Sequence, residues 1–308
     1  MKNIEGKRII LLKLLEESEN RFREYEKYSK GGFKNRIKKL FRYRWKYLRY
    51  ALSELIKKPL LVKGKVFWGE DFYGYLPDVR YIALFGILDV SEIKLTKFFI
   101  KSLKYNSVFF DIGASYGFYS LLATQLITKG EIHSFEPTPS TFELLSKNLL
   151  NKNRVFLNQI ALFNQEGEMD FYENKVGKSG LNTFNLSNIK SVFNPSLFKQ
   201  IRVKASTLDK YCLSHPKPTF VKIDVEGTEG NVIEGAVKTL ESGNPVIAME
   251  VWRKPLNNEG HLKAIEILGK LGYRPHSIDS NGELIKLREI DPEKDITALS
   301  DNFVFIKL

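Results

Sequence analysis

The chain has 308 residues, 43% of them hydrophobic, so it can bury a sizeable core and is not a disordered chain. Its single cysteine, Cys212, excludes an internal disulfide, and its longest apolar stretch, residues 81–88, is far shorter than the ~20 residues that span a bilayer. Residues 1–5 also lack a signal-peptide pattern, so the sequence predicts a cytoplasmic protein.

The net charge of +12 is unevenly distributed along the chain. Residues 1–60 contain 18 Lys and Arg but 7 Asp and Glu, a difference of +11. The remaining 30 basic and 29 acidic residues differ by only +1. We therefore predict a basic N-terminal arm over residues 1–60, followed by a separate domain over residues 61–308.

Two helical patterns fill this arm, and Gly31-Gly32 separates them. In the second pattern, apolar residues recur at spacings of three and four from Phe33 to Ile56, and basic residues occupy most of the other face. Such a helix can bind an anionic membrane surface through residues 30–58, or it can pack on the following domain or on a second subunit as an oligomer contact. Nucleic acid is a weaker alternative.

From about residue 60, short β-like runs alternate with helical patterns, which is typical of an α/β sheet. The polar stretch over residues 174–200 is expected to form a loop or lid over a site. Strands are predicted at 108–112, 131–135, 155–158, 220–225, 246–250, 273–278 and 302–307. Helices are predicted from the glycine loop to about 128, from the 137–140 stretch toward 148, around 232–240 and around 262–271.

The first of these strands ends in the pattern Asp-x-Gly-x-x-x-Gly, residues 111–117. Glycine lets a ligand approach the backbone closely, and the next helix offers free N–H groups at its N-terminus. Gly113 would pass beneath the amino-acid part of a nucleoside ligand, and Asp111 would receive its ammonium group. The pattern alone is weak, but the dinucleotide pattern Gly-x-Gly-x-x-Gly is absent, which argues against a nicotinamide or flavin cofactor.

Acidic residues also end three other predicted strands. Glu136, followed by Pro137, can chelate two ribose hydroxyls, or it can simply favour the N-terminus of the next helix. Asp224 and Glu226 point the same way, and Glu250 ends the neighbouring strand. These three carboxylates can share a proton, so that one becomes a general base, or they can hold Mg2+. The alternative for Glu226 is a merely structural place at a helix N-terminus.

Four segments resemble the FkbM-type methyltransferases in order and spacing, and the match covers roughly residues 70–308. They are Phe109 to Gly117, Phe135 to Pro139, Ser206 to Asp209 and Val221 to Glu229. The resemblance implies a class I methyltransferase (Rossmann-like) fold, with a doubly wound seven-stranded sheet whose last strand is antiparallel. It also implies S-adenosylmethionine as donor and O-methylation, commonly of sugar hydroxyls. Ser115 departs mildly from the family, whose members often have Asn at this position.

We therefore expect an S-adenosylmethionine-dependent O-methyltransferase that acts on a hydroxyl of a glycan or lipid-linked saccharide, in the cytoplasm and peripherally at a membrane. The expected catalytic residues are Asp224, Glu226 and Glu250, which also form the candidate Mg2+ site. The expected cofactor-binding residues are Asp111, Gly113, Ala114, Ser115, Gly117, Glu136 and Pro137. The rivals are a nucleic-acid methyltransferase that uses the basic arm and a non-catalytic binding protein of the same fold.

Overall fold

A computed structural model describes residues 2–30, 58–175, 179–184, 194–253, 256–296, 298 and 300–307. The amphipathic pattern from Phe33 to Ile56 lies outside these residues, so its predicted helix is not tested. The chain divides into two compact units, the first within Met1–Ile93 together with Lys175–Lys178, and the second over the remaining residues. No helix in the described ranges combines the length and the apolar character needed to cross a membrane.

The first unit begins with the predicted first helix of the arm, α1 (Lys2–Lys30), which ends directly before Gly31. A hairpin of β1 (Leu60–Lys65) and β2 (Asp71–Leu76) follows, and then the short helix α3 (Arg80–Phe85). The ring of Phe22 on α1 packs edge-on against Tyr81 and Phe85, at centroid distances of 5.3 and 5.5 Å. Aromatic packing therefore joins α1 to α3.

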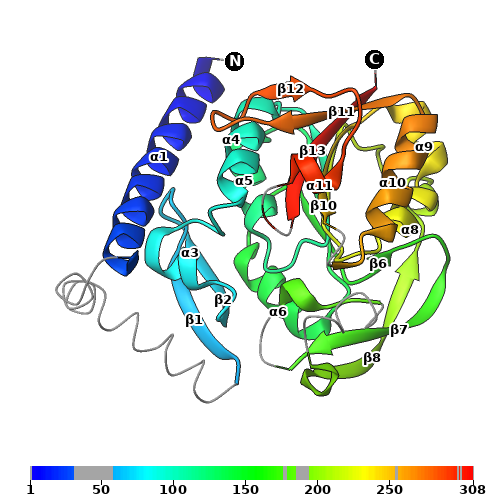
Figure 1. Ribbon diagram of the computed structural model, residues 1–308, viewed down its shortest axis with the longest axis horizontal. Helices are drawn as coiled ribbons and strands as arrows, with labels where there is room; N and C mark the ends of the chain where they lie inside the picture. The colour runs from blue at the N-terminus through cyan, green and yellow to red at the C-terminus, as the bar shows by residue number, and fades with distance from the viewer. Residues whose placement is uncertain are drawn as a thin grey trace. The chain divides into compact units, whose positions relative to one another are not determined.

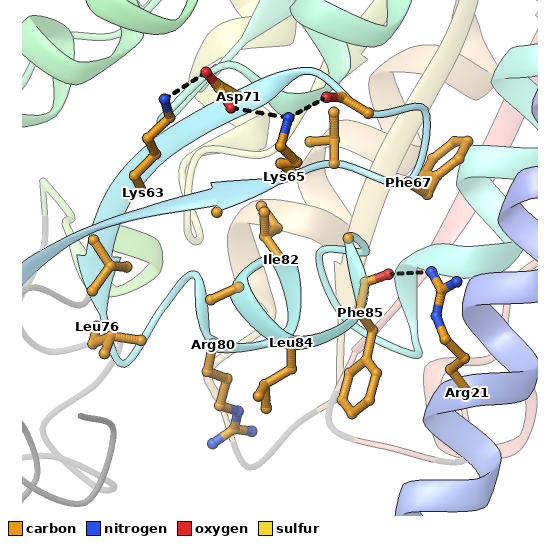
Figure 2. A pocket seen from close by; sticks show the side chains of 16 residues that line it. Arg21, Lys63, Lys65, Phe67, Asp71, Leu76, Arg80, Ile82, Leu84 and Phe85 are labelled. Carbon is orange, nitrogen blue, oxygen red and sulfur yellow. Dashed lines mark hydrogen bonds and ion pairs between the residues drawn. The ribbon is translucent and has the colours of Figure 1, made fainter. Parts of the chain in front are cut away.

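A cavity of about 680 Å3 lies in the first unit (Figure 2). Lys63 and Lys65 on its rim both contact the carboxylate of Asp71, at 2.6 and 3.5 Å. Arg21 donates to the carbonyl oxygen of Phe85 at 3.4 Å, and Arg80 points away from the two lysines. The cations of this cavity are therefore engaged locally and do not converge on one point.

The second unit contains an eight-stranded sheet in the order β12-β11-β13-β10-β9-β3-β4-β5. Strands β10, β9, β3, β4 and β5 are parallel, and the last strand, β13, runs antiparallel between β10 and β11. The predicted doubly wound α/β fold with an antiparallel last strand is confirmed, and the short β12 adds an edge strand beside β11. The bounds are β3 (Val108–Ile112), β4 (Glu131–Phe135), β5 (Val155–Asn158), β9 (Phe220–Ile223), β10 (Val246–Trp252), β11 (Tyr273–Ile278), β12 (Leu284–Lys286) and β13 (Ser300–Lys307).

Helices cover both faces of this sheet, with α4 and α5 on one face and α8, α9 and α10 on the other (Figure 1). On the α4 side, Phe99, Phe109 and Phe220 are buried and pack edge-to-face, with ring centroids 4.9 to 6.0 Å apart. The bounds are α4 (Glu92–Ser102), α5 (Phe118–Leu126), α6 (Pro139–Asn148), α7 (Leu208–Tyr211), α8 (Glu229–Glu234), α9 (Val237–Gly243), α10 (Glu259–Lys270) and α11 (Pro292–Asp295).

A second, smaller sheet interrupts the chain between β5 and β9. It joins β6 (Ala161–Leu162), β8 (Phe198–Ser206) and β7 (Gly167–Asn174), and β7 and β8 form an antiparallel pair. The predicted loop over 174–200 lies between these two strands. Its described parts include the 3-10 turns η1 (Ser179–Leu181) and η3 (Pro195–Leu197), and Thr183 bridges to Tyr172 on β7.

Candidate functional site

The predicted acidic residues meet at the carboxyl ends of four adjacent strands, β4, β3, β9 and β10. Ligands bind at this end of open α/β sheets. The loop after β3 turns sharply there, with Gly113 at a φ of 77° and with the N–H groups of Gly113 and Ala114 donating to the carbonyl oxygen of Phe135 at 3.0 and 2.9 Å. A Cβ atom at Gly113 would lie 1.8 Å from the carbonyl oxygen of Asp224. Only glycine therefore fits where this loop crosses the end of β9.

Asp111 is 1% exposed at the end of β3. Its Oδ2 accepts a hydrogen bond from the Ser120 hydroxyl at 2.6 Å, whereas its Oδ1 is buried without a hydrogen-bond partner among the described residues. Burial raises the pKa of Asp111, and the nearby ammonium of Lys222 opposes that shift. A buried carboxylate oxygen without a donor fits the ammonium group of an amino-acid ligand.

Glu136 is buried at the end of β4 and is held by backbone donors. Its Oε2 accepts from the N–H of Ser115 at 3.1 Å, and its Oε1 accepts from the N–H of Thr138 at 2.9 Å. Burial nevertheless raises the pKa of Glu136 to about 7. Ser115 and Gly117 lie at positive φ, 49° and 87°, in the turn that leads into α5. The turn after β3, residues 113–117, is thus hydrogen-bonded to the end of β4.

The raised pKa of Glu136 predicts a pH-dependent affinity for a ribose-containing ligand. Only the ionised carboxylate can accept from both ribose hydroxyls, so affinity should fall as pH drops through about 7. Between about pH 4.5 and 7 the carboxyl of Glu136 stays protonated in the folded chain but is ionised in the unfolded chain. The contribution of Glu136 to stability should therefore decrease as pH rises through this range. For Glu136→Gln we expect both effects to disappear, with roughly 10-fold to 100-fold weaker binding of S-adenosylmethionine at pH 8. Calorimetric titration and thermal melting between pH 5 and 8 measure the two effects, and unchanged affinity in the variant would remove Glu136 from the ribose contact.

The three predicted catalytic carboxylates also lie together. Asp224 is paired with Lys222, whose Nζ lies 2.8 Å from Oδ2. Glu226 follows at a φ of 59°, and burial together with the charges of Glu250 and Asp224 raises its pKa well above the usual 4.5. Glu250 accepts a hydrogen bond from the indole N–H of Trp252 at 2.8 Å. Glu226 is thus a carboxyl group with the environment of a general base.

The same carboxylates were the candidate ligands for Mg2+. Within the described ranges, no group of three His, Cys, Asp or Glu side chains is placed to hold a metal ion. The magnesium alternative therefore gains no support from the arrangement of Asp224, Glu226 and Glu250.

Two residues behind the site, Glu229 and His261, were not predicted to be part of it. Both side chains are fully buried, and His261 Nε2 lies 3.0 Å from Glu229 Oε2. The other oxygen, Oε1, accepts from the N–H groups of Val225 and Gly227 at 3.1 and 3.4 Å, so it holds both sides of Glu226. Glu229 is the first residue of α8, and its carboxylate turns inward to the preceding loop.

This fold and site define a class I, S-adenosylmethionine-dependent methyltransferase. The defining features are the strand order, the glycine turn and the acids at the ends of β3 and β4. The Methyltransferase FkbM domain matches residues 111–275, more than half of the chain. The chain belongs to this family.

Individual proteins show more distant similarity. The hexuronic acid methyltransferase AglP of Haloferax volcanii is 26% identical over 181 residues, which cover 54% of this chain and 70% of that protein. The FkbM methyltransferase structure from Methylobacillus flagellatus KT is 16% identical, covers 74% of this chain and 53% of that one, and has a TM-score of 0.43. The precorrin-6y C5,15-methyltransferase structure from Geobacter metallireducens is 18% identical, covers 72% of this chain and 89% of that one, and has a TM-score of 0.41.

Proposed function

We propose that this methyltransferase methylates a sugar oxygen, in a glycan or a lipid-linked saccharide. The observation that carries the proposal is the group of three carboxylates beside the glycine turn, in which Glu226 has a raised pKa. The family supplies the donor class, and the similarity to a hexuronic acid methyltransferase supports a sugar as acceptor. The absence of an Asn/Asp-Pro-Pro-Tyr/Phe stretch after β9 favours oxygen over nitrogen as the acceptor atom.

The donor fits the residues at the ends of β3 and β4. Bound S-adenosylmethionine supplies an electrophilic methyl group on a sulfonium centre. Asp111 Oδ1 is available for its ammonium, and Glu136 for its ribose hydroxyls. Gly113 and Gly117 give the turn its positive-φ shape, and Ala114 and Ser115 lie between them. Pro137 directly follows Glu136. We propose that these residues surround the donor.

The acceptor oxygen needs a base if it is a hydroxyl. Methyl transfer is an in-line displacement, so the protein must chiefly orient the acceptor and remove its proton. In our proposal Glu226 takes that proton, Glu250 and Asp224 keep the pKa of Glu226 high by their charge, and Lys222 holds Asp224 in place. A base whose pKa is raised toward neutrality is better matched to a weakly acidic hydroxyl than an ordinary carboxylate is.

A hexuronic acid offers two kinds of acceptor oxygen, hydroxyl and carboxylate. A carboxylate is already ionised at neutral pH and needs no base. The carboxylate cluster would be superfluous for such an acceptor and would repel its charge. We therefore assign a hydroxyl as the acceptor.

Two measurements test this function. Calorimetry should detect S-adenosylmethionine binding, and mass spectrometry of glycans and lipid-linked sugars from strains with and without the gene should find one methyl group lost on deletion. A product that is a methyl ester would contradict the hydroxyl assignment. Label from methyl-tritiated donor that enters only RNA would support the nucleic-acid rival, and no donor binding would leave only the non-catalytic alternative.

We also propose that the basic arm brings the enzyme, through residues 30–58, to an anionic membrane from the cytoplasmic side. The support is the charge difference of +11 within residues 1–60. The full chain should co-sediment with vesicles that contain phosphatidylglycerol and not with pure phosphatidylcholine vesicles. Equal binding to both, or to neither, would contradict this role of the arm.

A further inference from the structure

A groove of about 650 Å3 lies in the second unit, beside the proposed base. Its walls come from the small sheet, from the start of α8 and from the start of α10. Gly227 and Thr228, the two residues after Glu226, form part of its lining. The groove therefore shares a loop with the group that we assign to proton removal.

A second segment also joins the groove to Glu226. Thr183 donates from its hydroxyl to the carbonyl oxygen of Glu226 at 3.2 Å, and the next residue, Phe184, lines the groove. A Cβ atom at Gly180 would lie 3.3 Å from Glu226 Oε1, so the segment 179–184 passes directly over that carboxylate. The groove is therefore lined by residues of both segments that contact or adjoin Glu226, namely Phe184 on one side and Gly227 and Thr228 on the other.

The apolar part of the groove is aromatic. Phe163 and Phe184 lie with their ring centroids 4.8 Å apart, and Met169 on β7 lies in the same lining. Binding sites commonly combine such an apolar surface with a few oriented polar groups. Phe163 is largely buried, so the C–H face of a sugar ring can pack on the exposed parts of Phe184 and Met169.

The polar part of the groove includes a guanidinium group whose position is fixed by hydrogen bonds within the small sheet. Arg202 on β8 donates from Nη1 to Asp170 Oδ1 at 3.1 Å and from Nη2 to the carbonyl oxygen of Glu168 at 3.1 Å, while 60% of its side chain stays exposed. Asn231 on α8 also lines the groove. Planar guanidinium, carboxylate and amide groups supply both donors and acceptors, as neighbouring sugar hydroxyls require.

The charge of the groove lining favours a saccharide over a nucleic acid as the ligand. It contains three acids, Glu168, Asp170 and Glu259, and two bases, Arg202 and Lys263, a difference of −1. Lys263 is further engaged with Glu234 at 2.7 Å. Binding of a polyphosphate backbone requires a surplus of Lys and Arg, which this groove lacks.

We propose that this groove is an acceptor subsite, which binds the sugar unit next to the one that is methylated. The inference rests on the proposed function and adds to it that the acceptor is an oligosaccharide rather than a single sugar. Arg202 and Asn231 would bind its hydroxyls, and the partly exposed Phe184 would support a ring face, with the largely buried Phe163 behind it.

The test uses the full chain and the variants Arg202→Ala and Asn231→Ala. The matched control is Lys204→Ala, because Lys204 is an exposed base on the same strand that does not line the groove. The probe is a glycan pool from the source organism with the gene deleted, so that unmethylated acceptors remain. We expect both variants to raise the acceptor KM about 10-fold, with kcat within about threefold and donor affinity within twofold of the wild type, and Lys204→Ala to change none of them.

Retention of the same glycan pool on immobilised protein tests saccharide binding in the groove independently of methyl transfer. If the wild type retains saccharides and both variants lose that retention, the groove assignment stands even where no methyl is transferred, and the proposed function then fails alone. If the wild type methylates the pool and both variants keep its KM, the proposed function stands and the groove assignment is overturned. A fall in kcat with unchanged KM would indicate a structural role for these residues and would also overturn it.

Discussion

Replacing Glu226 by glutamine is expected to lower kcat by roughly 10^2-fold to 10^4-fold while leaving the affinity for S-adenosylmethionine within twofold. The amide cannot take a proton from the acceptor hydroxyl, but it keeps the shape of the side chain. Because the pKa of Glu226 is raised, the wild-type kcat should fall as pH drops through that value, and it should reach a plateau above it. Initial rates with saturating donor between pH 5 and 9 measure both effects.

Substitution of two other carboxylates, Asp224 and Glu241, allows their effects on kcat to be compared with that of Glu226→Gln. Asp224→Asn should also retain the donor and lose turnover, by a smaller factor, because Asp224 is paired with Lys222 and acts through the charge that it places beside Glu226. Glu241→Gln is the matched control, since Glu241 is an exposed carboxylate on α9. If Glu226→Gln turned over at the wild-type rate, the base would have to be another group. If it lost donor affinity as well, Glu226 would belong to the cofactor site.

The donor half of the site could be predicted from the sequence because its determinants are local. Asp111 and Gly113 sit at a strand end and in the turn that follows, and the buried run from Val108 identifies that strand without tertiary information. Glu136 follows in the same way from the next strand. The parallel order of β3, β4, β9 and β10 then brings their ends together, as doubly wound sheets do.

The small sheet was not predicted, for a physical reason. β7 and β8 carry exposed charges along much of their length, among them Glu168, Asp170 and Arg202, so their sequence resembles a polar loop. What stabilises them is cross-strand pairing, such as Asp170 opposite Arg202, and a few inward residues such as Phe171 and Val203. Pairing between distant residues is not visible in local periodicity.

The pair of Glu229 and His261 escaped prediction because its partners lie 32 positions apart in sequence. A glutamate at a helix start is usually explained by the helix dipole. Here the carboxylate instead accepts from two N–H groups of the loop before the helix, and a buried imidazole covers its other oxygen. His261 in turn packs on Trp252, at a ring distance of 4.9 Å, and the Trp252 indole N–H donates to Glu250. This chain of contacts runs from the loop that carries Glu226 to the neighbouring carboxylate of Glu250.

Replacing Glu229 by alanine is therefore expected to have a large effect on stability and on turnover. The substitution leaves the N–H groups of Val225 and Gly227 buried without their acceptor, and it removes the carboxylate oxygen that lies 3.0 Å from the His261 imidazole. We expect the free energy of unfolding to fall by about 3–5 kcal/mol. Denaturant titration measures this loss. The loop that carries Asp224 and Glu226 also loses its anchor, so kcat should fall at temperatures where the variant remains folded.

Glu229→Gln distinguishes anchoring of the loop from a need for negative charge. The glutamine oxygen can still accept from both N–H groups, and its amide can donate to the neutral imidazole, whose protonation burial disfavours by lowering the pKa of His261. If Glu229 only anchors the loop, Glu229→Gln should recover most of the stability and turnover that alanine loses, with the pH profile of kcat unshifted. A profile displaced to lower pH would mean instead that the charge of Glu229 contributes to the raised pKa of Glu226, since removal of a neighbouring negative charge lowers the pKa of a carboxyl group. Wild-type stability and turnover in Glu229→Ala would contradict both roles.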